Sequence, residues 1–384
     1  MIYLDNHATT QCDPEVLNAM LPYFSKQYGN AASGHNFGRE VAQAIQRATC
    51  EVGQFIGAES KEIIFTSGAT ESNNLAILGA TKSLPPNGKR RQLITTPLEN
   101  KSIIAPFQYL QTVGWEIIYL PVDASGRIDE IRAAELITEE TFLLSAQLAN
   151  SEIGTIQPIS AIGKIAKDCG VIVHCDAAQA LGKTPINVDD LNVDLLSISA
   201  HKIYGPKGIG ALWVNPYTDM HLKPLIYGGN PVLNLRPGTL PTPLIVGLGE
   251  ASRLCQLHLV AESRRLATLR NQFEQLLLKR IVGLKVNGSI HHRLPNNSNL
   301  TFPRISADAL LANVPELMAS TSSACEFGSI EPSRTLLGIG LSREEAANTL
   351  RFGFGRFTTD EEVESAVGML IEACSKLTQL IYAA

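Results

Sequence analysis

The chain has 384 residues, of which 45% are hydrophobic and 18% charged, and its formal net charge is −5. This length fits one large domain plus a smaller one, and the negative charge argues against direct nucleic-acid binding, which needs clustered Lys and Arg. The opening sequence MIYLDNHATT has no signal-peptide pattern, and we see no apolar window of membrane-spanning length. We therefore expect a cytoplasmic protein without membrane contact.

From about residue 62, apolar segments alternate with amphipathic helical patterns. The expected strands lie at 62–66, 92–96, 115–120, 141–148, 171–176 and 195–199, and helices begin after the first two. Strands that are apolar on both faces and separated by helices indicate a mostly parallel sheet covered by helices, an α/β architecture. After residue 256 the alternation is less regular, as in a smaller α+β domain. We predict a large domain at 16–256 and a small one formed by 1–15 and 257–384.

Four segments place small polar residues at strand ends or helix starts. They are FTSGATESNN (65–74), VIVHCDAAQALGK (171–183), SISAHK (197–202) and RPGTLPT (236–242). The first offers free backbone N–H groups at a helix N-terminus, which suit a phosphate. The next two supply an acid, Asp176, and a lysine, Lys202, at the ends of apolar strands. Together these groups fit the ligand crevice of an open α/β sheet.

Seven cysteines, at 12, 50, 169, 175, 255, 325 and 374, show no C-x-x-C spacing, so the pattern predicts neither a disulfide framework nor a metal site. Cys325 lies in TSSACEFGSIEP, a polar stretch that contains glycine and is typical of a mobile loop. A reactive thiolate must be accessible, and the cysteines in helical patterns or at a strand end are better explained as buried side chains. Cys325 is therefore the candidate nucleophile.

These segments, with YLDNHATT, GNAASGHNFG, SSACEFGSIEPS and LRFGFGRFTT, resemble the cysteine desulfurase family. That family consists of pyridoxal-phosphate enzymes of the class V aminotransferase group, with fold type I and a seven-stranded sheet. The resemblance implies that Lys202 carries the cofactor as a Schiff base, which removes its ammonium charge and makes burial at a strand end possible. It implies that Asp176 holds the pyridine nitrogen and that Gln179 bonds the ring hydroxyl.

The resemblance also assigns the remaining site residues. The phosphate group is bound by Ala69, Thr70, Ser199 and His201, with Thr239 reaching it from the other subunit of a homodimer. Arg351 pairs with the substrate carboxylate, and Ser151 is a second substrate-binding position. Arg356, five residues after Arg351, is a competing candidate that we interpret as a surface ion pair.

The sequence departs from the family pattern beside the cofactor. Asn100 stands where the family has a histidine that stacks on the cofactor ring, and Ser151 replaces an asparagine. His7 occupies an alanine position, and Pro237 replaces a serine. Two explanations remain open: a divergent desulfurase in which His7 or another group takes over the missing work, or a pyridoxal-phosphate protein with reduced or altered activity. The survival of Lys202 and Cys325 favours the first.

The implied reaction removes sulfur from L-cysteine, leaving L-alanine and a persulfide on Cys325 that passes to an acceptor protein. Iron–sulfur assembly, transfer-RNA thiolation and DNA phosphorothioation are all possible destinations. One alternative is a selenocysteine lyase. The other is a low-activity protein that acts mainly as a partner in a sulfur-transfer complex.

Overall fold

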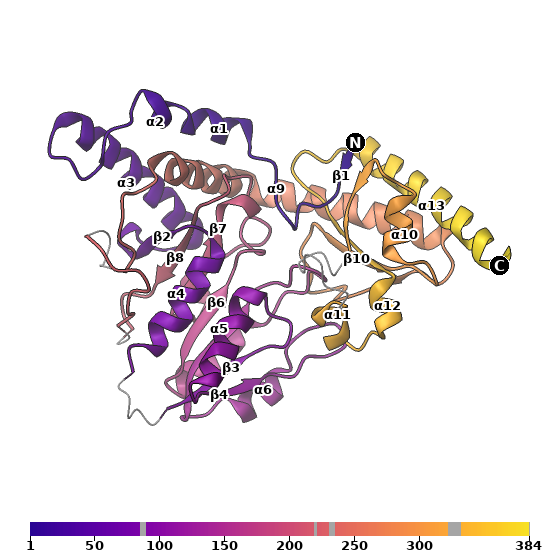
Figure 1. Cartoon of the computed structure of the whole chain (residues 1–384), viewed down its shortest axis with the longest axis horizontal. Helices are drawn as coiled ribbons and strands as arrows, with labels where there is room; N and C mark the ends of the chain where they lie inside the picture. The colour runs from indigo at the N-terminus through magenta and orange to yellow at the C-terminus, as the bar shows by residue number, and fades with distance from the viewer. Residues whose placement is uncertain (85–89, 219–220, 230–234, 322–331, 384) are drawn as a thin grey trace.

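The computed structural model describes residues 1–84, 90–218, 221–229, 235–321 and 332–383. Its centre is a seven-stranded sheet, seen below the long helix in Figure 1. The strand order is β2 (Ile63–Thr66), β8 (Gly210–Val214), β7 (Leu195–Ser199), β6 (Ile172–Asp176), β5 (Thr141–Gln147), β3 (Gln92–Thr95) and β4 (Glu116–Tyr119). Only β8 runs against the others. The predicted mostly parallel, seven-stranded sheet is confirmed.

Helices cover both faces of this sheet because its strands are apolar on both sides. Leu195 and its neighbour Leu196 belong to two different buried clusters, as expected for side chains that alternate along a strand. One face packs on α4 (Ala69–Thr81) and α5 (Lys101–Thr112). The other packs on α3 (Asn36–Ile56), α6 (Glu130–Leu136), α7 (Ile159–Asp168) and the first part of α9 (Thr242–Arg280). Shorter elements are α1 (Pro14–Met20), α2 (Pro22–Ser25), α8 (Val188–Leu191), η1 (Ser60–Glu62) and η2 (Ala200–Lys202).

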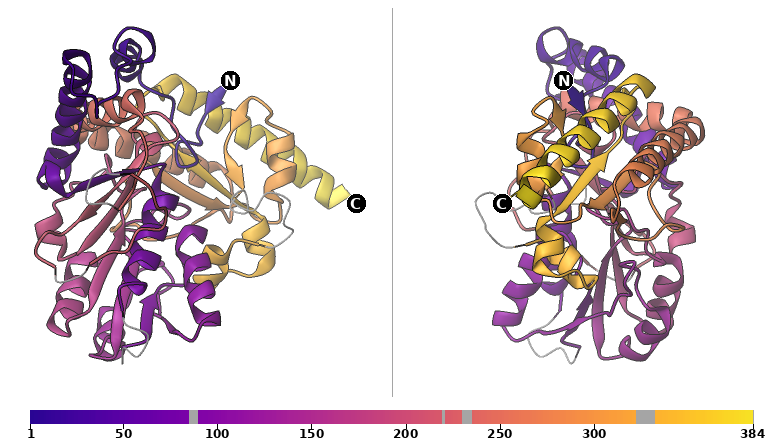
Figure 2. Two further views of the ribbon diagram at one scale, coloured as in Figure 1. Left: turned by 60° about the vertical axis from the view of Figure 1, so that its left-hand side comes forward. Right: turned by 90° about the vertical axis from the view of Figure 1, so that its right-hand side faces the viewer.

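The C-terminal part of the chain forms a second, smaller arrangement of a sheet and helices with its own buried cluster (Figure 2). Its antiparallel sheet has the order β12 (Ser320–Thr321), β13 (Thr349–Gly353), β10 (Asn297–Thr301) and β9 (Lys285–Val286). The N-terminal strand β1 (Ile2–Tyr3) joins this part by pairing in parallel with β11 (Leu317–Met318). The helices here are α10 (Ala307–Ala312), α11 (Arg334–Gly338), α12 (Arg343–Ala347) and α13 (Asp360–Ala383).

Helix α9 runs through both parts. Leu248 and Leu254 belong to the cluster on the large sheet, whereas Leu266 and Phe273 belong to the C-terminal cluster. The domain boundary predicted near residue 256 falls inside this helix, and the two-domain division stays a prediction. Of the helices that the structure describes, α9 alone has the length and apolar composition of a membrane span. Its N-terminal half packs on α3, so in this fold it is a core helix.

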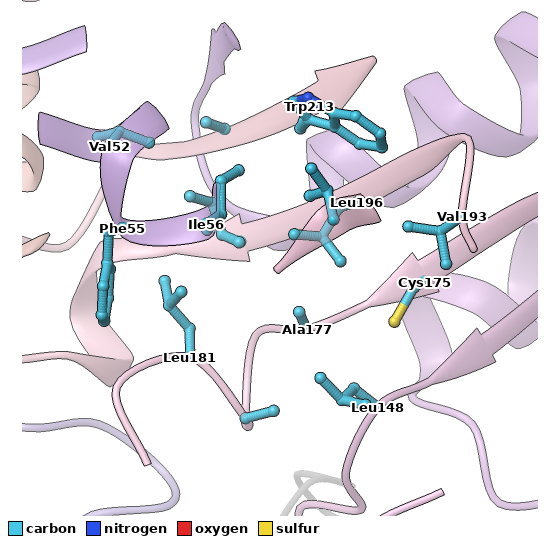
Figure 3. Close-up of a cluster of buried hydrophobic side chains, with 14 of the residues drawn as sticks. Val52, Phe55, Ile56, Leu148, Cys175, Ala177, Leu181, Val193, Leu196 and Trp213 are labelled. Atoms are coloured by element: carbon cyan, nitrogen blue, oxygen red, sulfur yellow. The ribbon is translucent and has the colours of Figure 1, made fainter. Parts of the chain in front are cut away.

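The sheet core also decides the environment of one cysteine. Cys175, at the penultimate position of β6, is fully buried, and its sulfur lies among Leu148, Val193 and other apolar side chains (Figure 3). Burial and the nearby Asp176 raise its pKa well above the usual value. Cys175 is therefore a packing residue, as its place at a strand end predicts.

Candidate active site

A cavity of about 550 Å³ opens at the C-terminal ends of β6 and β7, beside the N-terminus of α4. This is the edge at which open α/β sheets bind ligands. Nine of the predicted site residues line it together: Ala69, Thr70, Asn100, Ser151, Asp176, Gln179, Ser199, His201 and Lys202. The strand ends therefore bring together groups that are separated by up to 133 positions in sequence, from Ala69 to Lys202.

Lys202 ends the short helix η2 that follows β7. Its Nζ donates hydrogen bonds to the backbone carbonyls of His7 and, at 2.7 Å, of Ala8. Lys183, which is buried, donates from its own Nζ to the carbonyl of Lys202 and fixes that backbone from behind. Lys202 is thus an amine held at the cavity wall by the N-terminal segment of the chain.

Asp176 ends β6 and is 8% exposed. Its Oδ1 accepts from the backbone N–H of Ala178 at 2.9 Å, and its Oδ2 accepts from Nδ2 of Asn73 at 2.8 Å. Burial raises the pKa of Asp176, while these hydrogen bonds and the charge of Lys202 act in the opposite direction. The two donors orient a carboxylate that faces the cavity.

Asn100 is the N-cap of α5. Its Oδ1 accepts from both the backbone N–H and the hydroxyl of Ser102, each at 2.9 Å. Ser102 in turn accepts from Nδ2 of Asn73 at 2.9 Å, and the same nitrogen donates to Asp176. A chain of hydrogen bonds therefore connects the residue at the family's histidine position to the carboxylate at the end of β6.

The first turn of α4 provides the phosphate-type end of the cavity. Its N-cap, Gly68, makes no side-chain capping bond, so the backbone N–H groups at Ala69 and Thr70 remain available to an anion. His201, on the same wall, shares a hydrogen bond of 3.1 Å with Thr9. Burial, followed by the charges of Lys202 and Lys207, lowers its pKa to about 4, so the imidazole is neutral near pH 7.

Arg351, on β13, does not line this cavity but lies behind its wall. It is 4% exposed; its Nη2 pairs with Asp5 at 2.8 Å, and its Nη1 donates to the carbonyl of Ser151 at 3.3 Å. Arg356 does form ion pairs, with Asp13 at 2.7 Å and Glu262 at 2.8 Å. The predicted surface location is wrong, because the side chain of Arg356 is only 14% exposed.

One predicted residue, Thr239, lies elsewhere. Thr239 is exposed and lines a different cavity of about 690 Å³, together with Ala31 and Tyr227. Three residues before it, Arg236 pairs with Glu71 in the first turn of α4 at 3.1 Å. Cys325 falls outside the described residues.

Sequence reasoning missed several residues of this site, including four with polar side chains. Thr9 and Lys207 line the cavity, Ser102 lines it and donates to the cap residue Asn100, and Asn73 donates to Asp176. Asn73 had a signal, because a buried carboxylate needs donors and this asparagine lies within the quoted helix start. The others depend on how α4, α5 and the N-terminal segment pack together.

Known proteins match this architecture along nearly the whole chain. The Aminotransferase class-V family model matches residues 2–365. A cysteine desulfurase IscS of Anaeromyxobacter sp. (strain K) is 44% identical over 99% of this chain and 94% of that protein. Another, of Rickettsia massiliae (strain Mtu5), is 43% identical over 99% and 92%.

Solved structures agree with this match. A NifS-like protein superposes with a TM-score of 0.91 and 32% identity, covering 97% of this chain and 99% of that one. A structure described as SspA in complex with cysteine has a TM-score of 0.82 and 38% identity, covering 94% and 100%. From the sheet, the cavity at its edge and these matches, the chain belongs to the class V aminotransferase family and, within it, to the cysteine desulfurases, which use pyridoxal phosphate.

Proposed function

We propose that this chain removes sulfur from L-cysteine, releases L-alanine and passes the sulfur to an acceptor protein through a persulfide on Cys325. The observation that carries the proposal is one cavity that holds Lys202, the oriented carboxylate of Asp176 and the uncapped first turn of α4. We further propose that the enzyme works in the cytoplasm as a homodimer.

The residues around the cavity fit pyridoxal phosphate. A phosphate suits the N–H groups of the first turn of α4 and the hydroxyls of Thr70 and Ser199. Asp176, held by two donors, suits a protonated pyridine nitrogen, and Gln179 suits the ring oxygen. When bound, the cofactor supplies an electron sink for the α-carbon of an amino acid.

The chain's own groups then have distinct tasks. Lys202 anchors the cofactor through its Nζ and, once released, is the amine placed to take a proton from the α-carbon of cysteine. Neutral His201 contributes a hydrogen bond to the phosphate end without adding charge. Arg351 matches the arginine that binds the substrate carboxylate in the family, but in the structure its guanidinium pairs with Asp5 behind Ser151 and does not line the cavity.

Cys325 would take the sulfur atom. Its thiol and the substrate thiol together become one persulfide, Cys–S–SH, while the substrate carbon that loses sulfur gains a hydrogen and leaves as alanine. The balance requires no added oxidant or reductant.

The test combines cofactor, product and persulfide measurements on the purified protein. Borohydride treatment with pyridoxal phosphate should fix the cofactor on the peptide that contains Lys202, as seen by mass spectrometry. Cys325→Ser should keep the cofactor spectrum and bind cysteine but form no persulfide. Cys50→Ser, which changes a partly buried cysteine on α3, is the matched control and should retain persulfide formation. A parent protein that takes up no cofactor would refute the proposal.

The candidate acceptors of the sulfur belong to iron–sulfur assembly, transfer-RNA thiolation and DNA phosphorothioation. Isolation of the protein that receives labelled sulfur from the Cys325 persulfide would assign the pathway. A chain that yields no alanine from cysteine, yet binds such an acceptor, would instead be a partner protein.

A further inference from the structure

His7 is a buried histidine beside the cavity that the proposed reaction does not use. It is 1% exposed and follows β1 in the N-terminal segment. Its ring lies against β13 at Gly353, where an added Cβ would come within 2.8 Å of His7 Cδ2. The backbone N–H of the preceding Asn6 donates to the carbonyl of Gly353 at 3.1 Å. The imidazole is therefore held in one place by the C-terminal sheet.

Two contacts with Gln179 determine which ring nitrogen of His7 carries the hydrogen. Nε2 of Gln179 lies 3.1 Å from the backbone carbonyl of His7, which can only accept, so this end of the amide must be the NH₂ group. The amide oxygen then faces Nδ1 of His7 at 3.2 Å. Because that oxygen can only accept, Nδ1 must be the protonated nitrogen.

The imidazole is also neutral. Burial is the main cause that lowers the pKa of His7 to about 3, and Arg351 adds to it. Its Nε2 has no hydrogen-bond partner among the described residues. Among the described residues, Gln179 is the one hydrogen-bond partner of the His7 ring, and Nδ1–H donates to it.

These contacts leave Gln179 with a defined orientation toward the cavity that it lines. The oxygen and one hydrogen of its amide are engaged by His7, and the second hydrogen on Nε2 is left for a ligand. Donation to the amide oxygen also strengthens the N–H as a donor, because linked hydrogen bonds polarise one another. A donor at this position stabilises a negatively charged oxygen.

We propose that His7 is a positioning residue that holds Gln179 as a hydrogen-bond donor toward the ring oxygen of pyridoxal phosphate. The inference rests on the proposed function, because it assumes that the cofactor occupies this cavity. It gives His7, which stands at an alanine position of the family pattern, a task that alanine cannot perform.

The consequence is a shift in the protonation equilibrium of the bound cofactor. The N–H of Gln179 favours the deprotonated form of the holoenzyme, in which the ring oxygen of the cofactor bears more negative charge. Loss of this oriented N–H should therefore raise the apparent pKa that the visible spectrum reports. The charged groups near His7 and Gln179 are Arg351 on β13, Lys183, Lys202 and Asp176. All of them are kept in the variants below.

The test is a pH titration of visible absorbance on holoenzyme variants. His7→Leu removes the Nδ1–H that donates to Gln179, whereas His7→Asn places an amide N–H close to the position of Nδ1. We expect His7→Leu to raise the apparent pKa by about 0.5–1 unit, which corresponds to the loss of one oriented hydrogen bond, and His7→Asn to restore most of the parent value. If His7→Leu does not fold, His7→Ala replaces it in the comparison.

Cofactor content, measured on every sample, separates this inference from the proposed function. If His7→Leu or His7→Ala is fully loaded with cofactor and has the same apparent pKa as the parent, the role of His7 is overturned and the proposed function is not. An equal shift in His7→Asn and His7→Leu would also overturn it, because packing and not hydrogen bonding would then be responsible. A parent protein that cannot be loaded would overturn the proposed function, and this inference with it.

Discussion

Asn100 should stabilise the protein as a helix cap, although it replaces the family's ring-stacking histidine. Asn100→Ala removes the acceptor for the backbone N–H and the hydroxyl of Ser102, both at 2.9 Å. Loss of an N-cap side chain costs about 1 kcal/mol, within a range of roughly 0.5–2 kcal/mol. Since α5 packs on the sheet through Ile103 and Phe107, the loss should appear in the free energy of unfolding of the whole large-sheet region.

Urea denaturation of the cofactor-free protein measures this effect. Asn100→Ser, which keeps a capping oxygen, is the matched control and should stay within a few tenths of a kcal/mol of the parent. Asn100→His should also keep most of the stability, because His35 caps α3 in this chain by accepting from the N–H of Gly38 at 3.0 Å. If Asn100→Ala unfolded at the same urea concentration as the parent, the capping role would be refuted.

A second variant separates the cap from the link to Asp176. Ser102→Ala keeps the backbone N–H that Asn100 caps but removes the hydroxyl that accepts from Asn73. We expect it to weaken pyridoxal phosphate binding by about twofold to tenfold, the cost of one hydrogen bond, with a smaller change in stability than Asn100→Ala. Equal cofactor affinity in Ser102→Ala and the parent would show that the chain of hydrogen bonds does not reach the carboxylate.

Two further predictions concern the ion pair behind the site and the subunit boundary. Asp5→Ala leaves the buried Arg351 without its carboxylate partner, so the free energy of unfolding should fall by about 3 kcal/mol, whereas Asp5→Asn should lose less; unchanged stability of Asp5→Ala would contradict the pairing. We expect the protein to sediment as a homodimer in which Thr239, exposed in the single chain, reaches the phosphate site of the other subunit. Thr239→Ala should then weaken cofactor binding without dissociating the dimer. A loaded monomer would contradict the shared site.

The sheet and most of its site follow from local sequence. Buried parallel strands are continuous apolar runs, and the polar residues that follow them, such as Asp176 and Lys202, must meet at the same edge. The strand β8 (GALWV) is also an apolar run, but it is short and follows the glycines of GPKGIG, and it was not among the expected strands. Its identity depends on antiparallel pairing with β2 and β7.

The supporting shell of the site could not be predicted, because it depends on contacts between distant segments. Asn73 and Asp176 are 103 positions apart, and Gln179 and His7 are 172 apart. Arg356 reads as a surface charge from its local sequence, but Asp13 lies 343 positions away and Glu262 lies 94 away. The two ion pairs of Arg356 follow only from the packing of the N-terminal segment and α9 against β13 and the loop after it.

Glu99 offers a pH-dependent test of the same buried region. It is 8% exposed; its Oε1 accepts from the hydroxyl of Thr96 at 2.7 Å and the N–H of Gln147 at 3.1 Å. Its Oε2 has no hydrogen-bond partner among the residues that the structure describes. Burial is the main cause that raises the pKa of Glu99 from 4.5 to about 8. The folded protein therefore keeps this carboxyl protonated at pH values where the unfolded chain loses the proton.

The sign of the effect on stability follows from proton counting. Between pH 4.5 and about 8 the folded state holds one proton more than the unfolded state, so this group's contribution is fully present below pH 4.5 and is lost as the pH rises. The loss amounts to at most about 1.4 kcal/mol per pH unit. Glu99→Gln keeps the acceptor oxygen but cannot ionise, so its stability should not follow this decline.

Urea denaturation of the cofactor-free proteins at pH 5.5 and pH 7.5 measures the difference. The stability of Glu99→Gln relative to the parent should increase by about 2–3 kcal/mol over this interval. Glu140→Gln, which removes an exposed carboxylate, controls for the change in net charge and should run parallel to the parent. If the stabilities of Glu99→Gln and the parent changed in parallel, Glu99 would already be ionised in the folded protein. Its Oε2 would then need a positive charge or a water molecule as a partner, which a protonated carboxyl does not need.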